Sequence, residues 1–192
     1  ALEGMARTAD LLGRPDDARQ YRAIMLKIKE GYNRCWNGCS YRHPEYMGAT
    51  DDRVQALAVL SGIADASKYP AIFNVLKSQE YASPYMERYV MEALFQMGQG
   101  EYAMARLRKR IAPMVNDKDY PTLFEYWDAH KRGFRIGSSN HAWSGGGLTV
   151  IAQQLMGAQP LEPRWRKFKI EPQYVVFREA SLSVPTLSGT VS

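Results

Sequence analysis

Residues 83–98 read SPYMERYVMEALFQMG, and this stretch indicates the kind of fold that the chain adopts. Ser83 and Pro84 suit the start of a helix, because serine caps free backbone N–H groups and proline fits the first turn. Apolar residues then recur at helical spacing until Gly98 interrupts the pattern. The stretch therefore predicts a helix over 84–98 with one side turned toward a core.

The same pattern repeats on both sides of this helix. Pro15 suits another first turn, where Asp16 and Asp17 complement the positive end of the helix dipole. Short turns between about seven such segments favour antiparallel helix pairs. Residues 36–46, WNGCSYRHPEY, break the pattern and are typical of a small hairpin or loop around Asn37 and Gly38. Apolar spacing predicts the other helices over 2–12, 15–34, 51–62, 66–78, 101–114 and 141–157.

The composition changes after Pro160. FKIEPQYVVF at 168–177 and ASLSVPTLSGTVS at 180–192 are rich in β-branched and aromatic residues, with turn residues between them. We therefore expect a helical domain over 1–160 and the beginning of a β-domain over 161–192.

Composition and charge narrow the class of protein. A chain of 192 residues with 45% hydrophobic and 23% charged residues is typical of a soluble globular domain. No apolar run approaches the roughly 20 residues of a membrane helix, so no membrane partner is expected. The net charge of +5 is spread along the chain, and we interpret RLRKR at 106–110 as a solvated helix face, not as a nucleic-acid site. The N-terminus lacks the pattern of a secretory signal, and the compartment stays open.

The sequence predicts no cofactor and no metal site. Cys35, Cys39 and His43 are spaced like metal ligands, but a structural zinc needs a fourth ligand that nothing nearby supplies. A local disulfide and two free thiols both remain open for the cysteines, with free thiols favoured. The glycines at 145–147 lack the spacing and the lysine of a phosphate-binding loop.

The candidate functional residues fall in TLFEYWDAHKRGFRIGSSNHAWSGGG at 122–147. Glu125, among aromatic residues, could act as a base toward water, or it could be a surface glutamate paired with Lys131 or Arg132. His141 could bind a sugar hydroxyl or cap its own helix.

Aromatic residues and helix starts leave further alternatives open. Trp127 and Trp143 offer flat apolar faces on which sugar rings pack, although buried tryptophans are often core residues. Tyr85 and Glu87 lie at a helix start, where a structural role explains them and a pocket role stays open. No Ser-His-Asp set appears, and no carboxylate pair can be assigned.

The order of these motifs resembles the bacterial α-L-rhamnosidases of glycoside hydrolase family 78. The resemblance covers essentially the whole chain, and its most specific parts are TLFE, SNHAWSGG and LEPRWRKFKIEPQ at 161–173. It implies an (α/α)6 barrel built from antiparallel helix pairs and followed by a β-domain. The implied activity is hydrolysis of terminal α-L-rhamnose from glycosides with inversion. It also implies that Glu125 is the general base and that His141 contacts the sugar, a role we extend to Trp127 and Trp143.

The resemblance also implies that part of the machinery is missing. An inverting glycosidase needs a carboxylic acid, the general acid, about 6.5–9.5 Å from its general base. In the family this acid lies in an acid-rich segment, and no segment of this chain matches it. We therefore expect the C-terminal half of a catalytic domain, inactive alone, which associates with itself or with an N-terminal half. Relatives are often exported, so a periplasmic or extracellular parent protein stays open.

Two alternatives remain. One is an (α/α)6 glycosidase of other sugar specificity, since a fold does not set its substrate. The other is a non-catalytic helical module that binds protein or carbohydrate, for which Glu125 and His141 should diverge in space.

Overall fold

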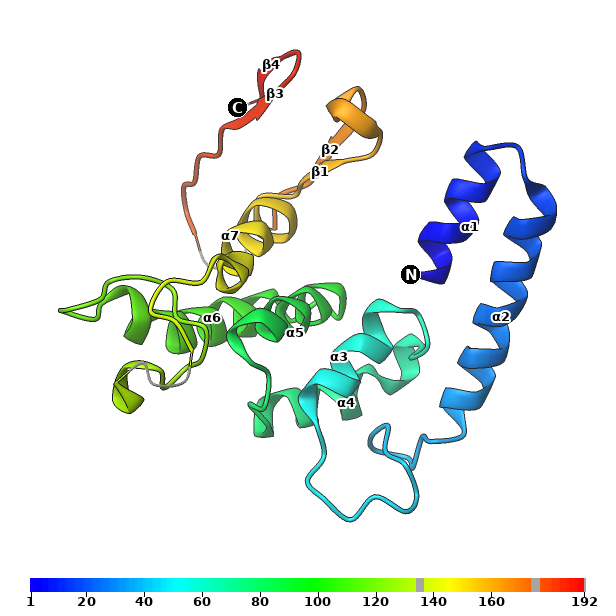
Figure 1. Ribbon diagram of the computed structural model, residues 1–192, viewed down its shortest axis with the longest axis horizontal. Helices are drawn as coiled ribbons and strands as arrows, with labels where there is room; N and C mark the ends of the chain where they lie inside the picture. Colours follow the sequence, from blue (N-terminus) through cyan, green and yellow to red (C-terminus); the bar gives the residue numbers. More distant parts are fainter. Residues whose placement is uncertain (134–136, 174–176, 192) are drawn as a thin grey trace.

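The computed structural model describes residues 1–133, 137–173 and 177–191, and within them the chain is mainly helical. Seven α-helices in the described residues precede two short hairpins of β-strands (Figure 1). The helices are α1 Leu2–Leu11, α2 Pro15–Asn33, α3 Asp52–Leu60, α4 Tyr69–Ser78, α5 Pro84–Gln96, α6 Gly100–Val115 and α7 Gly146–Val150. The strands are β1 Ala158–Pro160, β2 Phe168–Ile170, β3 Val184–Thr186 and β4 Gly189–Val191. The predicted fold class, a mainly α chain followed by a short β-rich segment, is confirmed.

The helix ends agree with the local chemistry of the sequence. Ser83 caps α5 by accepting a hydrogen bond from Met86 N at 3.3 Å, and Asp51 caps α3 by accepting one from Arg53 N at 2.8 Å. A 3₁₀ turn at Ala66–Lys68 precedes α4, and a π-helix at Ile151–Leu155 continues α7. All the predicted helical segments are therefore present, with differences at their ends.

Helix α5 lies at the centre of the helical layer and contacts α3, α6 and α7 (Figure 1). Its buried residues include Val90, Met91, Leu94 and Phe95, all part of the main hydrophobic core. Close packing with α7 is possible because Gly146 has no side chain. A Cβ atom there would lie 2.7 Å from Arg88 Cβ. This contact brings the start of α7 over the N-terminal half of α5.

Helices α1 and α2 pack against each other at one edge of the molecule (Figure 1). They bury only small side chains, namely Ala6, Ala9 and Ala18. Large apolar side chains on this hairpin are exposed, namely Met5, Leu11, Leu12, Ile24, Leu26 and Ile28. These exposed side chains are consistent with the expected self-association, which stays a prediction.

A buried ionic network joins α3, α5 and α6. Arg106 Nε lies 2.6 Å from Glu87 Oε1, and Arg106 Nη2 lies 2.9 Å from Asp52 Oδ2. Arg110, one turn further along α6, has its Nε 3.3 Å from Glu87 Oε2. Burial opposes the charge of Arg106, but Glu87 and then Asp52 raise its pKa above the ordinary value. Burial lowers the pKa of Arg110.

The interpretation of residues 106–110 as a solvated face is therefore wrong for two of its four basic residues. Arg106 is 2% exposed and Arg110 is 9% exposed, whereas Arg108 and Lys109 are exposed. Glu87, for which a pocket role stayed open, is 2% exposed and belongs to the same network. The sequence did not reveal this arrangement because the carboxylate partners come from two other helices.

The two β-hairpins follow α7. β1 pairs antiparallel with β2, and β3 pairs antiparallel with β4. The expected domain boundary after residue 160 falls at the end of β1 and stays a prediction. Residues 174–176, which belong to the predicted β-rich stretch, lie outside the described residues.

Gly157, which leads into β1, is expected to tolerate no side chain. Its φ of +66° is in the left-handed region, and an added Cβ would lie 2.0 Å from the carbonyl oxygen of Glu171. Gly62 has a φ of +67° with nothing within 4 Å, so Gly62→Ala measures the backbone strain alone. We expect Gly62→Ala to lower the free energy of unfolding by about 1 kcal/mol. Gly157→Ala should lower it by about 1–3 kcal/mol more. Urea denaturation of both variants measures the difference, and equal losses would contradict the close approach.

Candidate functional site

Two separate loops form the candidate site, and backbone hydrogen bonds hold them together. His141 N donates to Leu123 O at 2.8 Å, and Glu125 N donates to Ser138 O at 3.1 Å. Thr122 Oγ1 also donates to Ser139 O. The two loops therefore bring Glu125 and His141 together across the short stretch of chain between them.

A small second core fixes the position of the first loop. Phe124 is fully buried and packs with Met114 and Ala129. The hydroxyl of Ser144, itself buried, donates to Phe124 O at 2.6 Å. Glu125 follows this anchored residue and is half-buried.

The side chains of Glu125 and His141 converge on Ser138. Oε2 of Glu125 accepts a hydrogen bond from Ser138 N at 2.9 Å, and Ser138 Oγ lies 3.4 Å from the same oxygen. Ser138 Oγ also lies 3.4 Å from His141 Nδ1. Among the described residues, Oε1 of Glu125 and Nε2 of His141 have no hydrogen-bond partner. One oxygen of the carboxylate and one nitrogen of the imidazole can therefore bind a ligand.

This geometry decides between some of the alternatives for the two residues. His141 precedes the 3₁₀ turn Ala142–Gly145, but its side chain makes no capping hydrogen bond. The described hydrogen bond of the Glu125 carboxylate comes from Ser138 N. The side chain of Arg132, one of the two suggested ion-pair partners, lies outside the described residues. The two residues converge, whereas the binding-module alternative requires them to diverge.

Aromatic side chains line the site beside His141. The ring of His141 meets Trp143 edge-on at 4.5 Å between centroids, and Tyr85 packs on Trp143 at 5.3 Å. Tyr85 and Tyr89 bring their hydroxyls to 3.2 Å, and this hydrogen bond, with burial, raises the pKa of Tyr89. Trp143 and Tyr85 are each 40% exposed, so part of each ring remains accessible beside His141.

Sequence reasoning singled out Trp143 and left Tyr85 open, but it missed Tyr89 and Ser138. The spacing of Tyr85 and Tyr89 contained a signal, because residues four apart on a helix lie on one face. No comparable signal marked Ser138, whose role depends on how the two loops meet.

Trp127 lies differently from the other predicted sugar contacts. It is half-buried, and its indole N–H donates to Ala82 O at 2.7 Å. The guanidinium of Arg110 lies 4.3 Å from the centroid of its ring. Its described contacts are therefore with α6, the segment before α5 and the small core around Phe124, and a sugar contact by Trp127 stays a prediction.

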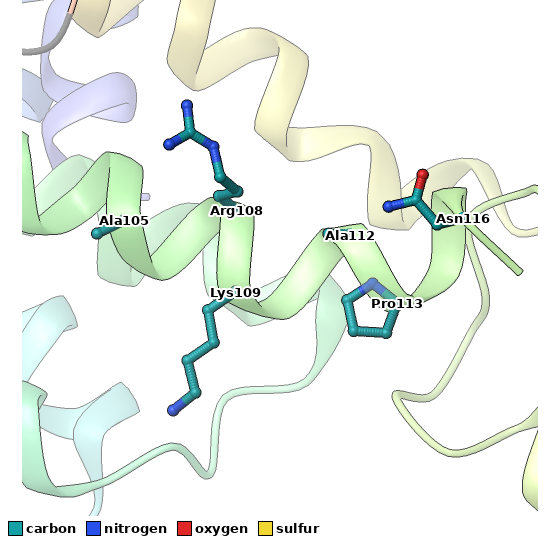
Figure 2. A pocket seen from close by; sticks show the side chains of 6 residues that line it. All are labelled: Ala105, Arg108, Lys109, Ala112, Pro113 and Asn116. Atoms are coloured by element: carbon teal, nitrogen blue, oxygen red, sulfur yellow. The ribbon is translucent and has the colours of Figure 1, made fainter.

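Two hollows in the described surface lie apart from Glu125 and His141. One of about 520 Å³ lies along α6, where Figure 2 shows Arg108 and Lys109 pointing to opposite sides of the helix. Its remaining lining residues are Ala105, Ala112, Pro113 and Asn116. The other, of about 490 Å³, lies between the end of α2, the loop before α3 and the start of α3, with Tyr32, Tyr41, Arg42 and His43 among its lining residues. Neither contains a predicted site residue.

The described residues contain no group of three or more His, Cys, Asp or Glu side chains that could hold a metal ion. Cys35 and Cys39 are both free. Within the described part of the chain, no helix has the length and apolar character needed to cross a membrane.

The described fold is a series of helical hairpins with a short β-segment after it. The structure is similar to the crystal structure of a glycoside hydrolase family 78 rhamnosidase of Bacillus sp. GL1, with a TM-score of 0.78 and 23% sequence identity. The similarity covers 98% of this chain and 22% of that chain, so this chain spans about a fifth of the length of that enzyme. No family model matches the sequence, and no curated protein matches it significantly. The expected rhamnosidase-like fold is therefore confirmed.

Proposed function

We propose that this chain supplies the general base and part of the sugar pocket of an inverting glycoside hydrolase that removes terminal α-L-rhamnose from glycosides. The observation that carries the proposal is the convergence of Glu125 and His141 on Ser138, next to the partly exposed rings of Trp143 and Tyr85. The likeness of the fold to a rhamnosidase supports the choice of sugar.

Glu125 has the arrangement that a general base requires. Ser138 N holds Oε2 in place, and Oε1 is open to a water molecule. In the proposed reaction, Oε1 takes a proton from this water as the water oxygen attacks the anomeric carbon. The glycosidic bond breaks on the opposite face, where a carboxylic acid protonates the leaving oxygen. We propose that this acid comes from residues outside these 192, and that the chain alone is inactive.

His141 and Trp143 would orient the sugar. Ser138 has one hydroxyl proton, and donation of this proton to Glu125 leaves Ser138 Oγ to accept from His141 Nδ1–H. In the neutral imidazole, Nε2 is then an acceptor for a sugar hydroxyl. Trp143 and Tyr85 provide apolar faces for the ring carbons.

Hydrolysis of a panel of aryl glycosides by the complete catalytic protein tests the proposal. We expect p-nitrophenyl α-L-rhamnoside to be the preferred substrate, and proton NMR to detect β-L-rhamnose as the first product because the reaction inverts the anomeric carbon. The chain alone should show no turnover. Preference for another aryl glycoside would support the alternative sugar specificity, and α-L-rhamnose as the first product would contradict inversion.

A further inference from the structure

We propose that Arg110 and Trp127 form a clamp that positions Glu125, so that Trp127 acts on the reaction through Glu125 and not by contact with the sugar. The clamp is a structural claim about this chain, and its effect on catalysis rests on the proposed function.

The clamp closes on a single peptide group. Trp127 Nε1 and Arg110 Nη2 both donate to Ala82 O, each at 2.7 Å. The guanidinium of Arg110 also lies over the indole ring, 4.3 Å from its centroid, which is the geometry of a cation–π contact. Trp127 is therefore held both by its N–H group and by its ring.

Ala82, whose carbonyl oxygen binds Trp127, is itself held in place by neighbouring residues. Ala82 N donates to Asp52 Oδ2 at 3.3 Å, so the residue is held from both sides. Arg110 Nη1 donates to Glu80 O at 3.1 Å, and Arg110 Nε lies 3.3 Å from Glu87 Oε2. The side chain of Arg110 is 7% exposed and that of Glu87 is 2% exposed. These buried contacts tie the Ala82 peptide to α3, α5 and α6 and form the support of the clamp, although Asp52 Oδ1 and Arg110 Nε have no hydrogen-bond partner among the described residues.

Glu125 lies between two such supports. On its N-terminal side, Phe124 is fixed by Ser144 and by the small core around Met114. On its C-terminal side, Trp127 is attached to the buried network through Ala82. With the second support removed, the backbone at Glu125 can move away from Ser138, and a misplacement of about 1 Å can reduce a rate by about 100-fold.

Hydrogen exchange in the ligand-free chain tests the clamp. Trp127→Phe keeps the ring and removes only the N–H donor, and Arg110→Met removes the cation while keeping most of the side-chain volume. We expect both variants to increase the exchange rate of the Glu125 amide, which donates to Ser138 O, by about tenfold or more. Arg108→Met, an exposed residue on the same helix, is the matched control and should leave this rate unchanged. If Trp127→Phe exchanged like the control, the clamp would be overturned.

Steady-state kinetics of the complete catalytic protein separate positioning from sugar contact. A positioning role predicts that Trp127→Phe lowers kcat for p-nitrophenyl α-L-rhamnoside by about tenfold, with KM within about twofold of wild type. A raised KM with unchanged kcat would instead assign Trp127 to the sugar and overturn the proposal. If the wild-type protein hydrolysed no rhamnoside, the proposed function would fail, while the exchange experiment would still decide whether the clamp exists.

Discussion

Glu125→Gln is expected to reduce the kcat of the complete catalytic protein by about 100- to 10,000-fold. Glutamine keeps the size of the side chain and can still accept from Ser138 N, which lies 2.9 Å from Oε2. It cannot take a proton from water, so attack on the anomeric carbon loses its general base. Initial rates with p-nitrophenyl α-L-rhamnoside measure kcat, and calorimetric titration with L-rhamnose measures whether the sugar still binds.

The matched control is Glu30→Gln, which removes one carboxylate from an exposed position on α2. Its kcat and its affinity for L-rhamnose should equal those of the wild type. The affinity of Glu125→Gln should also stay within a few-fold of wild type, because the sugar contacts assigned to His141 and Trp143 remain. A Glu125→Gln variant with near wild-type kcat would refute the assignment of the base.

Arg106→Met is expected to give the largest loss of stability, about 3–5 kcal/mol in the free energy of unfolding. Arg106 donates to Glu87, to Asp52 and to the carbonyl oxygens of Leu76 and Gln79, and its side chain is 1% exposed. Methionine fills much of the same space but leaves two buried carboxylates without their main partner. Urea denaturation followed by circular dichroism measures the loss.

Two comparisons isolate the buried charge as the cause. Arg108→Met makes the same chemical change at an exposed position of α6 and should alter the free energy of unfolding by less than about 0.5 kcal/mol. Replacing Arg106, Glu87 and Asp52 together with apolar residues of similar volume should recover part of the loss, because the two buried carboxylates are removed with their partner while Arg110 keeps Glu80 at 3.4 Å. A single Arg106→Met variant as stable as the Arg108 control would show that the network contributes little.

The regular elements of this protein were largely predictable because their signals are local. Ser83 and Pro84 give the start of α5, and the caps, glycines and apolar spacing give the other helices within a few residues. The change to β-strands after α7 was equally visible in composition. The ends of α4 and α7 were less predictable, since a 3₁₀ turn and a π-helix have no distinct apolar period.

The contacts that join these elements were not predictable in the same way. The pattern RLRKR shows that Arg106 and Arg110 lie one turn apart on a helix. Only the packing of α3 and α5 against α6 brings the carboxylates of Asp52 and Glu87 to Arg106. Similarly, TLFE and SNHAWSGG identified Glu125 and His141 as candidates, but neither motif indicated that Ser138 joins them. Trp127 is the clearest case, because its neighbours Ala82 and Arg110 are distant in sequence.

The sequence by itself determined which segments are helices and strands, and which residues could perform acid–base and sugar-binding chemistry, because those properties depend on side-chain type and spacing over a few residues. The tertiary structure alone decided which charges are buried, which face of each aromatic ring is free and which side chains converge. Those properties depend on distances between segments that are not adjacent along the chain, and they decide that Glu125 meets His141 through Ser138 while Trp127 meets Arg110.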